Sequence, residues 1–87
     1  SEHMKTSLAL SLNADKPGSL LMILSELNYA NVNLTMIQSR PTKQGLGDYL
    51  FFVDLEGTPA DPAIKTALDC LRLKLREVKV LGSYPAE

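Results

Sequence analysis

Apolar and polar residues alternate along the first part of the chain. Residues 5–13 place Leu8, Leu10 and Leu12 between serine and alanine residues, and this period of two predicts a half-buried β-strand. Residues 13–18 combine asparagine, aspartate, proline and glycine, which favour turns and so end the strand.

Two later segments have the three-and-four spacing of apolar residues that is typical of α-helices. Residues 17–29 form the first, and the proline at its start fits a first helical turn, where a missing N–H is tolerated. Asp61 and Pro62 begin the second, because aspartate can cap free N–H groups and proline suits the first turn. The apolar stripes expected to face a sheet are Leu20, Ile23, Leu24 and Leu27 in the first helix, and Ile64, Ala67, Leu68 and Leu71 in the second.

The other segments predict three more strands. Residues 31–41 alternate and then end in a polar turn at a sheet edge. The short loop of residues 42–47 predicts an antiparallel hairpin into a mostly apolar strand over residues 48–56. A last strand is expected from about residue 75 to 83. In the second strand, one face is expected to hold Val32, Leu34 and Met36, and the other Asn33, Thr35 and Ile37.

This order of elements is βαββαβ. With short connections it predicts an α+β fold, a ferredoxin-like sandwich in which a four-stranded antiparallel sheet carries both helices on one face. The opposite face and the strand edges then remain to be covered.

Composition narrows the function classes. A chain of 87 residues makes one domain. Its net charge of −1 and scattered basic residues argue against nucleic acid, and no apolar stretch is long enough to span a membrane. The single cysteine, Cys70, fits a reducing compartment, with cytoplasm as the expected location. No metal-ligand spacing is present, so neither metal nor cofactor is expected.

Four ordered motifs give the chain a family resemblance. Residues 33–35 and 38–41, Asn-Leu-Thr and Gln-Ser-Arg-Pro, resemble the Glu-Ser-Arg-Pro region of the ACT domain that ends prephenate dehydratases. Residues 16–20, 49–57 and 80–85 resemble that family's first turn, third strand and closing strand. The resemblance covers about residues 5–85. Residues 5–87 are therefore expected to form an ACT regulatory domain, and residues 1–4 resemble a cloning remnant.

The first candidate site motif is the turn before the first helix. Its glycine permits close approach of a ligand, and the helix start presents free N–H groups that suit a carboxylate. An ordinary strand-to-helix turn explains the same residues. The residues of this motif are Pro17, Gly18, Ser19 and Leu20.

The second motif offers polar groups for an ammonium and apolar surface for an aromatic ring. Asn31, Asn33 and Thr35 supply the former, and ordinary turn and strand chemistry is the alternative. The family resemblance implies that phenylalanine is enclosed between the first motif of one subunit and the second motif of its partner, in a homodimer or tetramer. The second motif's ligand-binding residues are then Asn31, Val32, Asn33, Leu34, Thr35, Gln38 and Ser39.

Two residues of the Gln-Ser-Arg-Pro segment need separate comment. Gln38 stands where the family usually has glutamate, so a formal negative charge is replaced by a neutral acceptor. Arg40, followed by Pro41, is expected to anchor the turn or a subunit contact through carbonyls or carboxylates.

The resemblance implies an L-phenylalanine sensor that feeds back on an attached prephenate dehydratase, with or without a fused chorismate mutase, and that has no catalytic residues of its own. Its catalytic domain would be the other partner. A structural ACT dimerisation module, or the regulatory domain of another aromatic amino acid enzyme, is the alternative. An acylphosphatase-like enzyme shares the predicted topology, but residues 14–18 lack the arginine that such a loop needs.

Overall fold

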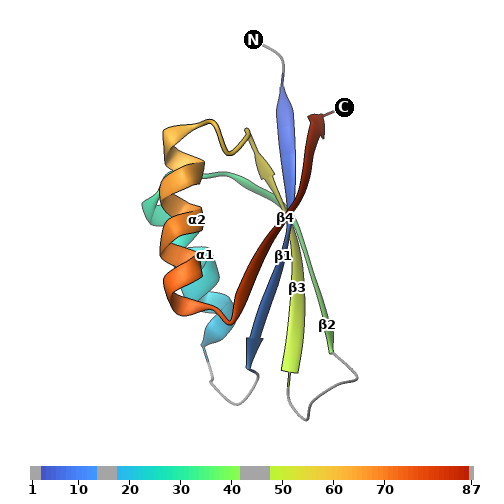
Figure 1. The fold of residues 1–87 in the computed structure, drawn as a ribbon, viewed down its shortest axis with the longest axis vertical. Coiled ribbons are helices and arrows are strands. Elements are labelled where there is room, and N and C mark those ends of the chain that lie inside the picture. The colour runs from blue at the N-terminus through green and yellow to red at the C-terminus, as the bar shows by residue number, and fades with distance from the viewer. Residues whose placement is uncertain (1–2, 14–17, 42–47, 87) are drawn as a thin grey trace.

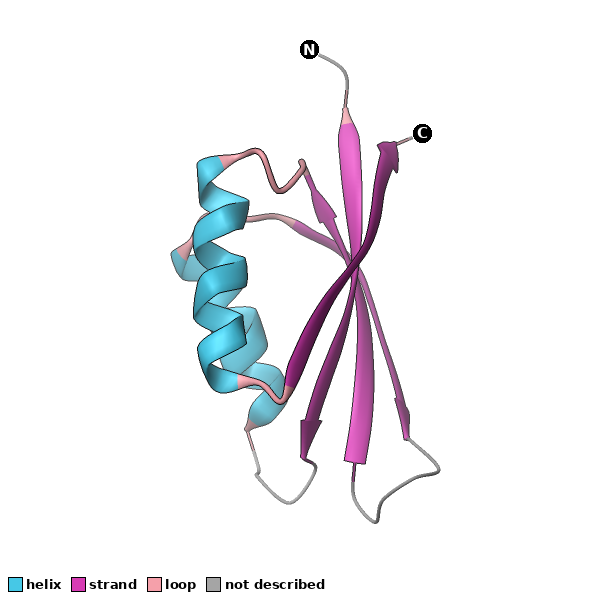
Figure 2. Cartoon of the chain, viewed as in Figure 1, coloured by secondary structure: helices cyan, strands magenta, loops and turns pink. Residues whose placement is uncertain are grey.

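The computed structural model describes residues 3–13, 18–41 and 48–86. It contains a single four-stranded sheet of strand order β2-β3-β1-β4, in which every neighbouring pair is antiparallel. Both helices lie on one side of this sheet (Figures 1 and 2). The predicted ferredoxin-like α+β architecture is therefore confirmed. The elements are β1 (Met4–Asn13), α1 (Ser19–Tyr29), β2 (Leu34–Pro41), β3 (Asp48–Glu56), α2 (Pro62–Lys74) and β4 (Glu77–Pro85).

Three predicted boundaries are wrong. β2 begins at Leu34 rather than at residue 31, because Asn31 has a left-handed φ of 61° and belongs to the turn that follows α1. α1 begins at Ser19, because Gly18 has a φ of 85° that no helix residue adopts; Pro17 lies outside the described residues. β4 runs two residues later than expected, to Pro85.

The core lies between the sheet and the two helices. The alternation predicted for the first strand is confirmed, since Leu8, Leu10 and Leu12 are buried. All four stripe residues of α2 are buried as well. The stripe of α1 is only half buried: Ile23 and Leu27 are covered, whereas Leu20 and Leu24 remain 43% and 37% exposed.

The position of α1 over the sheet explains those two exposed leucines. Glu26 of α1 contacts Lys74 of α2, so this side of α1 faces the neighbouring helix. At 100° per residue, Leu20 and Leu24 lie on the opposite flank of α1. Because α2 packs beside β4, that flank of α1 faces the sheet edge formed by β2.

A β-bulge in β2 overturns the predicted assignment of its faces. Leu34 pairs with Leu55 and Met36 pairs with Asp54, so Thr35 is an extra residue on β2. Directly opposed residues share a face, and an extra residue reverses the alternation after it. Ile37 therefore shares the helix-covered face with Val53, and Met36 lies on the open face.

The second helix starts differently from the prediction. Pro62 does occupy the first turn, and Asp61 holds the N-cap position. The Asp61 side chain makes no hydrogen bond to the helix; its Oδ2 instead accepts one from the Thr58 N–H at 3.1 Å. Asp61 thus closes the turn that precedes α2 rather than capping α2 itself.

The contact between the helices is an ion pair with an expected pH dependence. Lys74 Nζ donates to Glu26 Oε1, and this hydrogen bond together with the glutamate charge raises the pKa of Lys74 above its usual value of 10.5. A raised lysine pKa stabilises the fold fully below the unfolded-state pKa and loses this effect as the pH rises through the folded-state pKa.

Thermal unfolding of the wild type and of Lys74→Met tests this sign. The wild type is expected to melt at a higher temperature near pH 8, and the difference should shrink near pH 11 as Lys74 loses its proton. Lys65→Met is a suitable control, because Lys65 pairs with Asp69 on its own helix and does not join α1 to α2. A difference that stays constant across this pH range would contradict the prediction.

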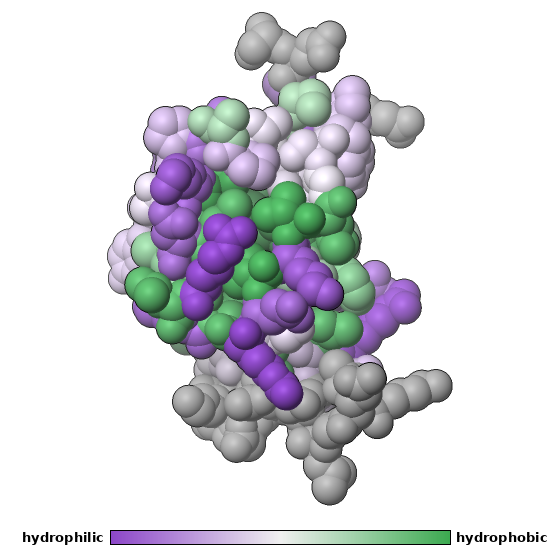
Figure 3. Space-filling model, in the orientation of Figure 1, coloured by the Kyte–Doolittle hydropathy of each residue, from purple (hydrophilic) through white to green (hydrophobic). Residues whose placement is uncertain are grey.

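Both edges of the sheet expose apolar side chains. Figure 3 shows such side chains gathered on the side of the molecule where α2 and β4 lie; Val80 and Leu81 of β4 are partly exposed there. Met36 and Ile37 are partly exposed on β2, at the other edge. Among the described helices, none is long and apolar enough to cross a membrane.

Candidate ligand-binding edge

The strand β2 forms one edge of the sheet, as its polar ending predicts. Seven of its eight residues are exposed over more than a third of their surface, and Leu34 is the exception. An edge strand leaves a row of backbone N–H and C=O groups without sheet partners. This edge can therefore accept another strand or a polar ligand.

The turn before α1 is open around its glycine. Gly18 has φ 85° and ψ 5°, a left-handed conformation that favours glycine, and its carbonyl accepts the first helical hydrogen bond from the Met22 N–H at 2.9 Å. Apart from Gly18 and its chain neighbours, no atom of the described residues lies within 4 Å of the position that a Gly18 Cβ would occupy. The start of α1 is thus approachable by a ligand group, and Leu20 in the first helical turn contributes exposed apolar surface.

The two candidate motifs lie at opposite ends of α1. Gly18 precedes the helix, whereas residues 31–35 follow it, and eleven helical residues span about 16 Å. Pairing of Pro41 with Tyr49, and of Tyr49 with Leu12, places residues 38–41 at the same end of the sheet as the turn into α1 (Figure 1). One copy of the chain therefore does not bring residues 18–20 and residues 31–35 together.

Most polar side chains of the second motif make no hydrogen bond within the described part of the chain. Asn31, Asn33, Gln38 and Ser39 have side chains without a hydrogen bond to any residue that the structure describes. Thr35 Oγ1 donates to the Asp54 carbonyl at 3.2 Å, and its oxygen lone pairs remain as acceptors. These groups are positioned to meet a ligand or a second chain.

The apolar part of the motif divides into core and surface. Val32 and Leu34 pack against the buried core from its margin. Ile37 and Met36 are the apolar residues of β2 with more than a third of their surface exposed. Apolar surface for an aromatic ring therefore comes from these two residues more than from Val32 and Leu34.

The Arg40 side chain has no polar partner in the part of the chain that the structure describes. It is exposed and makes no hydrogen bond or ion pair with residues 3–13, 18–41 or 48–86. The turn that follows Pro41 lies outside the described residues, so both roles predicted for Arg40, the turn anchor and the subunit contact, stay predictions.

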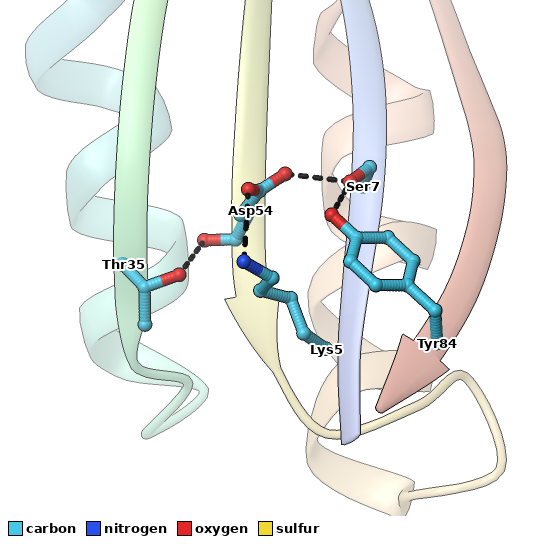
Figure 4. Close-up of polar contacts among 5 residues, drawn as sticks. All are labelled: Lys5, Ser7, Thr35, Asp54 and Tyr84. Atoms are coloured by element: carbon cyan, nitrogen blue, oxygen red, sulfur yellow. Dashed lines mark hydrogen bonds and ion pairs between the residues drawn. The ribbon is translucent and has the colours of Figure 1, made fainter. Parts of the chain in front are cut away.

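A polar cluster on the open face of the sheet escaped the sequence analysis. Ser7 Oγ donates to Asp54 Oδ1 at 2.6 Å and lies 2.8 Å from the Tyr84 hydroxyl, while Lys5 Nζ is 3.7 Å from Asp54 Oδ2 and 5.4 Å from the Tyr84 ring centre (Figure 4). Asp54 is only 8% exposed. The available signal was a lone aspartate inside an apolar strand. No group of three or more potential metal ligands occurs in the described part of the chain.

Sequence comparison identifies the family. The ACT domain family model matches residues 6–69. The chain belongs to the ACT domain family. The match includes the motifs of the first turn, second strand and third strand, at residues 16–20, 33–41 and 49–57.

Individual relatives of this ACT domain are prephenate dehydratases. It is 46% identical over 81 residues to prephenate dehydratase from Mycobacterium marinum, covering 93% of this chain and 25% of that protein. It is 44% identical over 81 residues to the bifunctional chorismate mutase/prephenate dehydratase of Aquifex aeolicus, covering 93% of this chain and 22% of the relative.

A solved structure of prephenate dehydratase from Arthrobacter aurescens in complex with L-Phe superposes with a TM-score of 0.86 at 38% identity, covering 95% of this chain and 27% of that one. The ACT domain described here thus spans about a quarter of the length of such relatives. It corresponds to their ACT part and not to their catalytic part.

Proposed function

We propose that this ACT domain binds L-phenylalanine and, as part of a cytoplasmic prephenate dehydratase, mediates feedback inhibition of phenylalanine biosynthesis. One observation carries the proposal: the open Gly18 turn and the unoccupied polar groups of residues 31–35 lie at opposite ends of one copy, beside a free strand edge. The L-Phe complex of the Arthrobacter aurescens relative supports the choice of ligand.

A homodimer completes the site. Two copies that pair antiparallel through β2 are related by a two-fold axis, which reverses the second copy end for end. Residues 31–35 of one copy then lie at the level of Gly18 of the other. The same contact covers Leu20 and Leu24 of α1, which face this edge. A tetramer can form from two such dimers.

The groups at this interface match a zwitterionic amino acid with a large side chain. The start of α1 beside Gly18 offers N–H groups and the positive end of the helix dipole to the ligand carboxylate. Asn33, Thr35 and Gln38 offer acceptors to its ammonium, and Ile37 offers apolar surface to its ring.

Regulation follows from thermodynamic linkage between ligand binding and the conformation of the parent enzyme. A ligand that binds between two ACT domains favours whichever conformation of the parent enzyme closes that interface. A coupling free energy of about 1–3 kcal/mol changes an equilibrium by roughly 5- to 150-fold, which suffices to inhibit an attached catalytic domain.

Calorimetric titration of this domain with L-phenylalanine tests the proposal. We expect one ligand per chain, bound at an interface that requires the dimer, and no binding of D-phenylalanine or an aliphatic amino acid at the same concentration. Chirality matters because carboxylate, ammonium and ring are held by separate groups. Absence of heat at several temperatures, or equal binding of both enantiomers, would contradict it.

A structural dimerisation module is the second candidate, and Gln38 is the observation that favours it. A neutral amide in place of the family's glutamate weakens attraction for an ammonium: a hydrogen bond to a charged group contributes about 1.5–3 kcal/mol, against roughly 0.5–1.5 for a neutral one. A dimer that binds no aromatic amino acid would identify this second function.

A further inference from the structure

Two charged side chains near the β2 edge are incompletely paired within one copy. Arg40 is exposed and has no hydrogen-bond or ion-pair partner among the described residues. Asp54 is 8% exposed, and its Oδ1 accepts from Ser7, but its Oδ2 has only Lys5 Nζ at 3.7 Å, beyond hydrogen-bond distance. A nearly buried carboxylate oxygen without a direct donor is costly.

Both side chains lie on the same face of the sheet. Met36 pairs with Asp54, and Asp54 pairs with Ser7 of β1, so these residues belong to the open face. Arg40, four residues after Met36 on the regular part of β2, pairs with Leu50 and shares that face. Both helices cover the other face of the sheet (Figure 2). Neither helix therefore lies on the face that Arg40 shares with Asp54.

The sequence of β2 selects one register for pairing with a second copy. Opposed residues must share a face, so Met36, Gln38 and Arg40 pair among themselves. A two-fold axis at Gln38 pairs Met36 with Arg40 and uses the regular part of the strand. An axis at Ile37 would run into the Thr35 bulge, and an axis at Ser39 would place Pro41, which has no N–H, in the ladder.

In that register Arg40 comes into line with Asp54 of the second copy. Arg40 lies opposite the second copy's Met36, and Met36 in turn lies opposite Asp54. The two charged residues are then two strand spacings apart, about 10 Å between Cα atoms. An arginine side chain that extends over Met36 covers most of this distance. Asp54 Oδ1 is turned to Ser7 of β1, so Oδ2, which has Lys5 Nζ at 3.7 Å, is the carboxylate oxygen left for Arg40 to reach.

We propose that Arg40 of each copy forms an ion pair with Asp54 of the other, which makes two symmetric ion pairs across the β2 edges. This inference rests on the proposed β2 dimer and names the contact that fixes its register. Thr35 of the bulge donates a hydrogen bond to the Asp54 carbonyl. Ser7, itself hydrogen-bonded to Tyr84, donates to the Asp54 carboxylate (Figure 4). The same ion pair therefore sets the level at which residues 31–35 meet the other copy's Gly18.

Mixing two variants tests whether the pair forms between copies. Arg40→Met and Asp54→Asn homodimers each lose both ion pairs. A heterodimer of the two retains one, between Arg40 of the D54N copy and Asp54 of the R40M copy, and leaves no unpaired charge. We expect native mass spectrometry, with one variant ¹⁵N-labelled, to show heterodimers well above the statistical proportion, and each homodimer to dissociate roughly tenfold more readily than wild type.

Statistical mixing of stable dimers would overturn the ion pair and leave the proposed sensor function standing. A monomeric wild type would overturn the ion pair together with the dimer. Titration of the wild type with L-phenylalanine reports on the sensor function separately. The control mixture combines Arg40→Met with Arg72→Met in place of Asp54→Asn. Arg72 lies near Asp69 of its own helix, so this mixture should give the statistical proportion of heterodimers whichever variant carries the ¹⁵N label.

A second series avoids any dependence on how well the Asp54 variant folds. Arg40→Glu places a negative charge against the second copy's Asp54 and is expected to weaken the dimer more than Arg40→Met, whereas Arg40→Lys should restore part of the affinity. High salt should reduce these differences in dimer affinity only weakly, because salt screens a nearly buried charge such as Asp54 less than it screens an exposed ion pair. Equal dissociation constants for the glutamate and methionine variants would overturn the proposal.

Discussion

Replacing Gly18 with valine should abolish measurable binding of L-phenylalanine, with affinity lowered by roughly 100-fold or more. Among the described residues other than its chain neighbours, no atom lies within 4 Å of a Gly18 Cβ, so a valine side chain would fill the place where the ligand carboxylate approaches α1. Loss of one charge-assisted hydrogen bond of about 1.5–3 kcal/mol lowers the affinity by about 10- to 150-fold, and loss of a second lowers it further. Titration calorimetry measures it.

The valine also strains the backbone, and the control separates the two effects. At φ 85° a residue with a Cβ is disfavoured by about 1–3 kcal/mol, which the fold is expected to survive. Gly18→Ala carries the strain with far less bulk. If strain alone weakened binding, alanine and valine would lower the affinity equally, and undiminished affinity in the valine variant would refute the proposed site.

Replacing Gly57 with alanine should destabilise the domain by about 3 kcal/mol or more. Gly57 has φ 103°, where a Cβ costs about 1–2 kcal/mol. The added carbon would also collide with Oδ2 of Asp61 and lie 2.8 Å from Cδ1 of Ile64, which is 2% exposed and cannot move aside cheaply. Overpacking of this kind costs about 1–3 kcal/mol more. Urea unfolding followed by circular dichroism measures the change.

The surroundings of Gly57 increase the expected effect. Its N–H donates to the Met4 carbonyl at 2.7 Å, and its own carbonyl accepts from the buried Thr6 hydroxyl at 2.7 Å. The matched control is Gly18→Ala, which shares the left-handed φ but meets no atom within 4 Å among the described residues other than its chain neighbours. Equal losses of stability in the two alanine variants would show that the contacts with Asp61 and Ile64 contribute nothing.

Local sequence patterns sufficed to predict the helices and strands and their order along the chain. Alternation in residues 5–13, helical spacing in residues 62–74 and the turn sequences between them each depend on neighbours within a few positions, which the sequence displays directly. The half-buried stripe of α1 was not readable in this way. Leu20 and Leu24 match the helical period as well as Ile23 does, and only the position of α1 beside the β2 edge leaves them exposed.

The candidate site likewise has features that the local sequence predicts and features that it does not. The glycine that permits close approach before α1 and the polar residues of β2 were predictable, because they are properties of the residues themselves. The left-handed φ of Gly18 was not predicted, since residues 17–29 were expected to be helical. The bulge at Thr35 was not predictable, because it arises from how β2 registers against β3, and it reverses the face on which every later residue of β2 lies.

By itself, then, the sequence determined the βαββαβ order, the family and the residue types available to a ligand. Only the tertiary structure decided which of them meet: it separated residues 18–20 from residues 31–35 by the length of α1 and placed Asp54 against Ser7 across the sheet. The physical reason is the distance along the chain over which each kind of interaction acts. Propensity and periodicity act over a few residues, whereas strand register and helix placement depend on contacts between segments as distant as Ser7 and Tyr84.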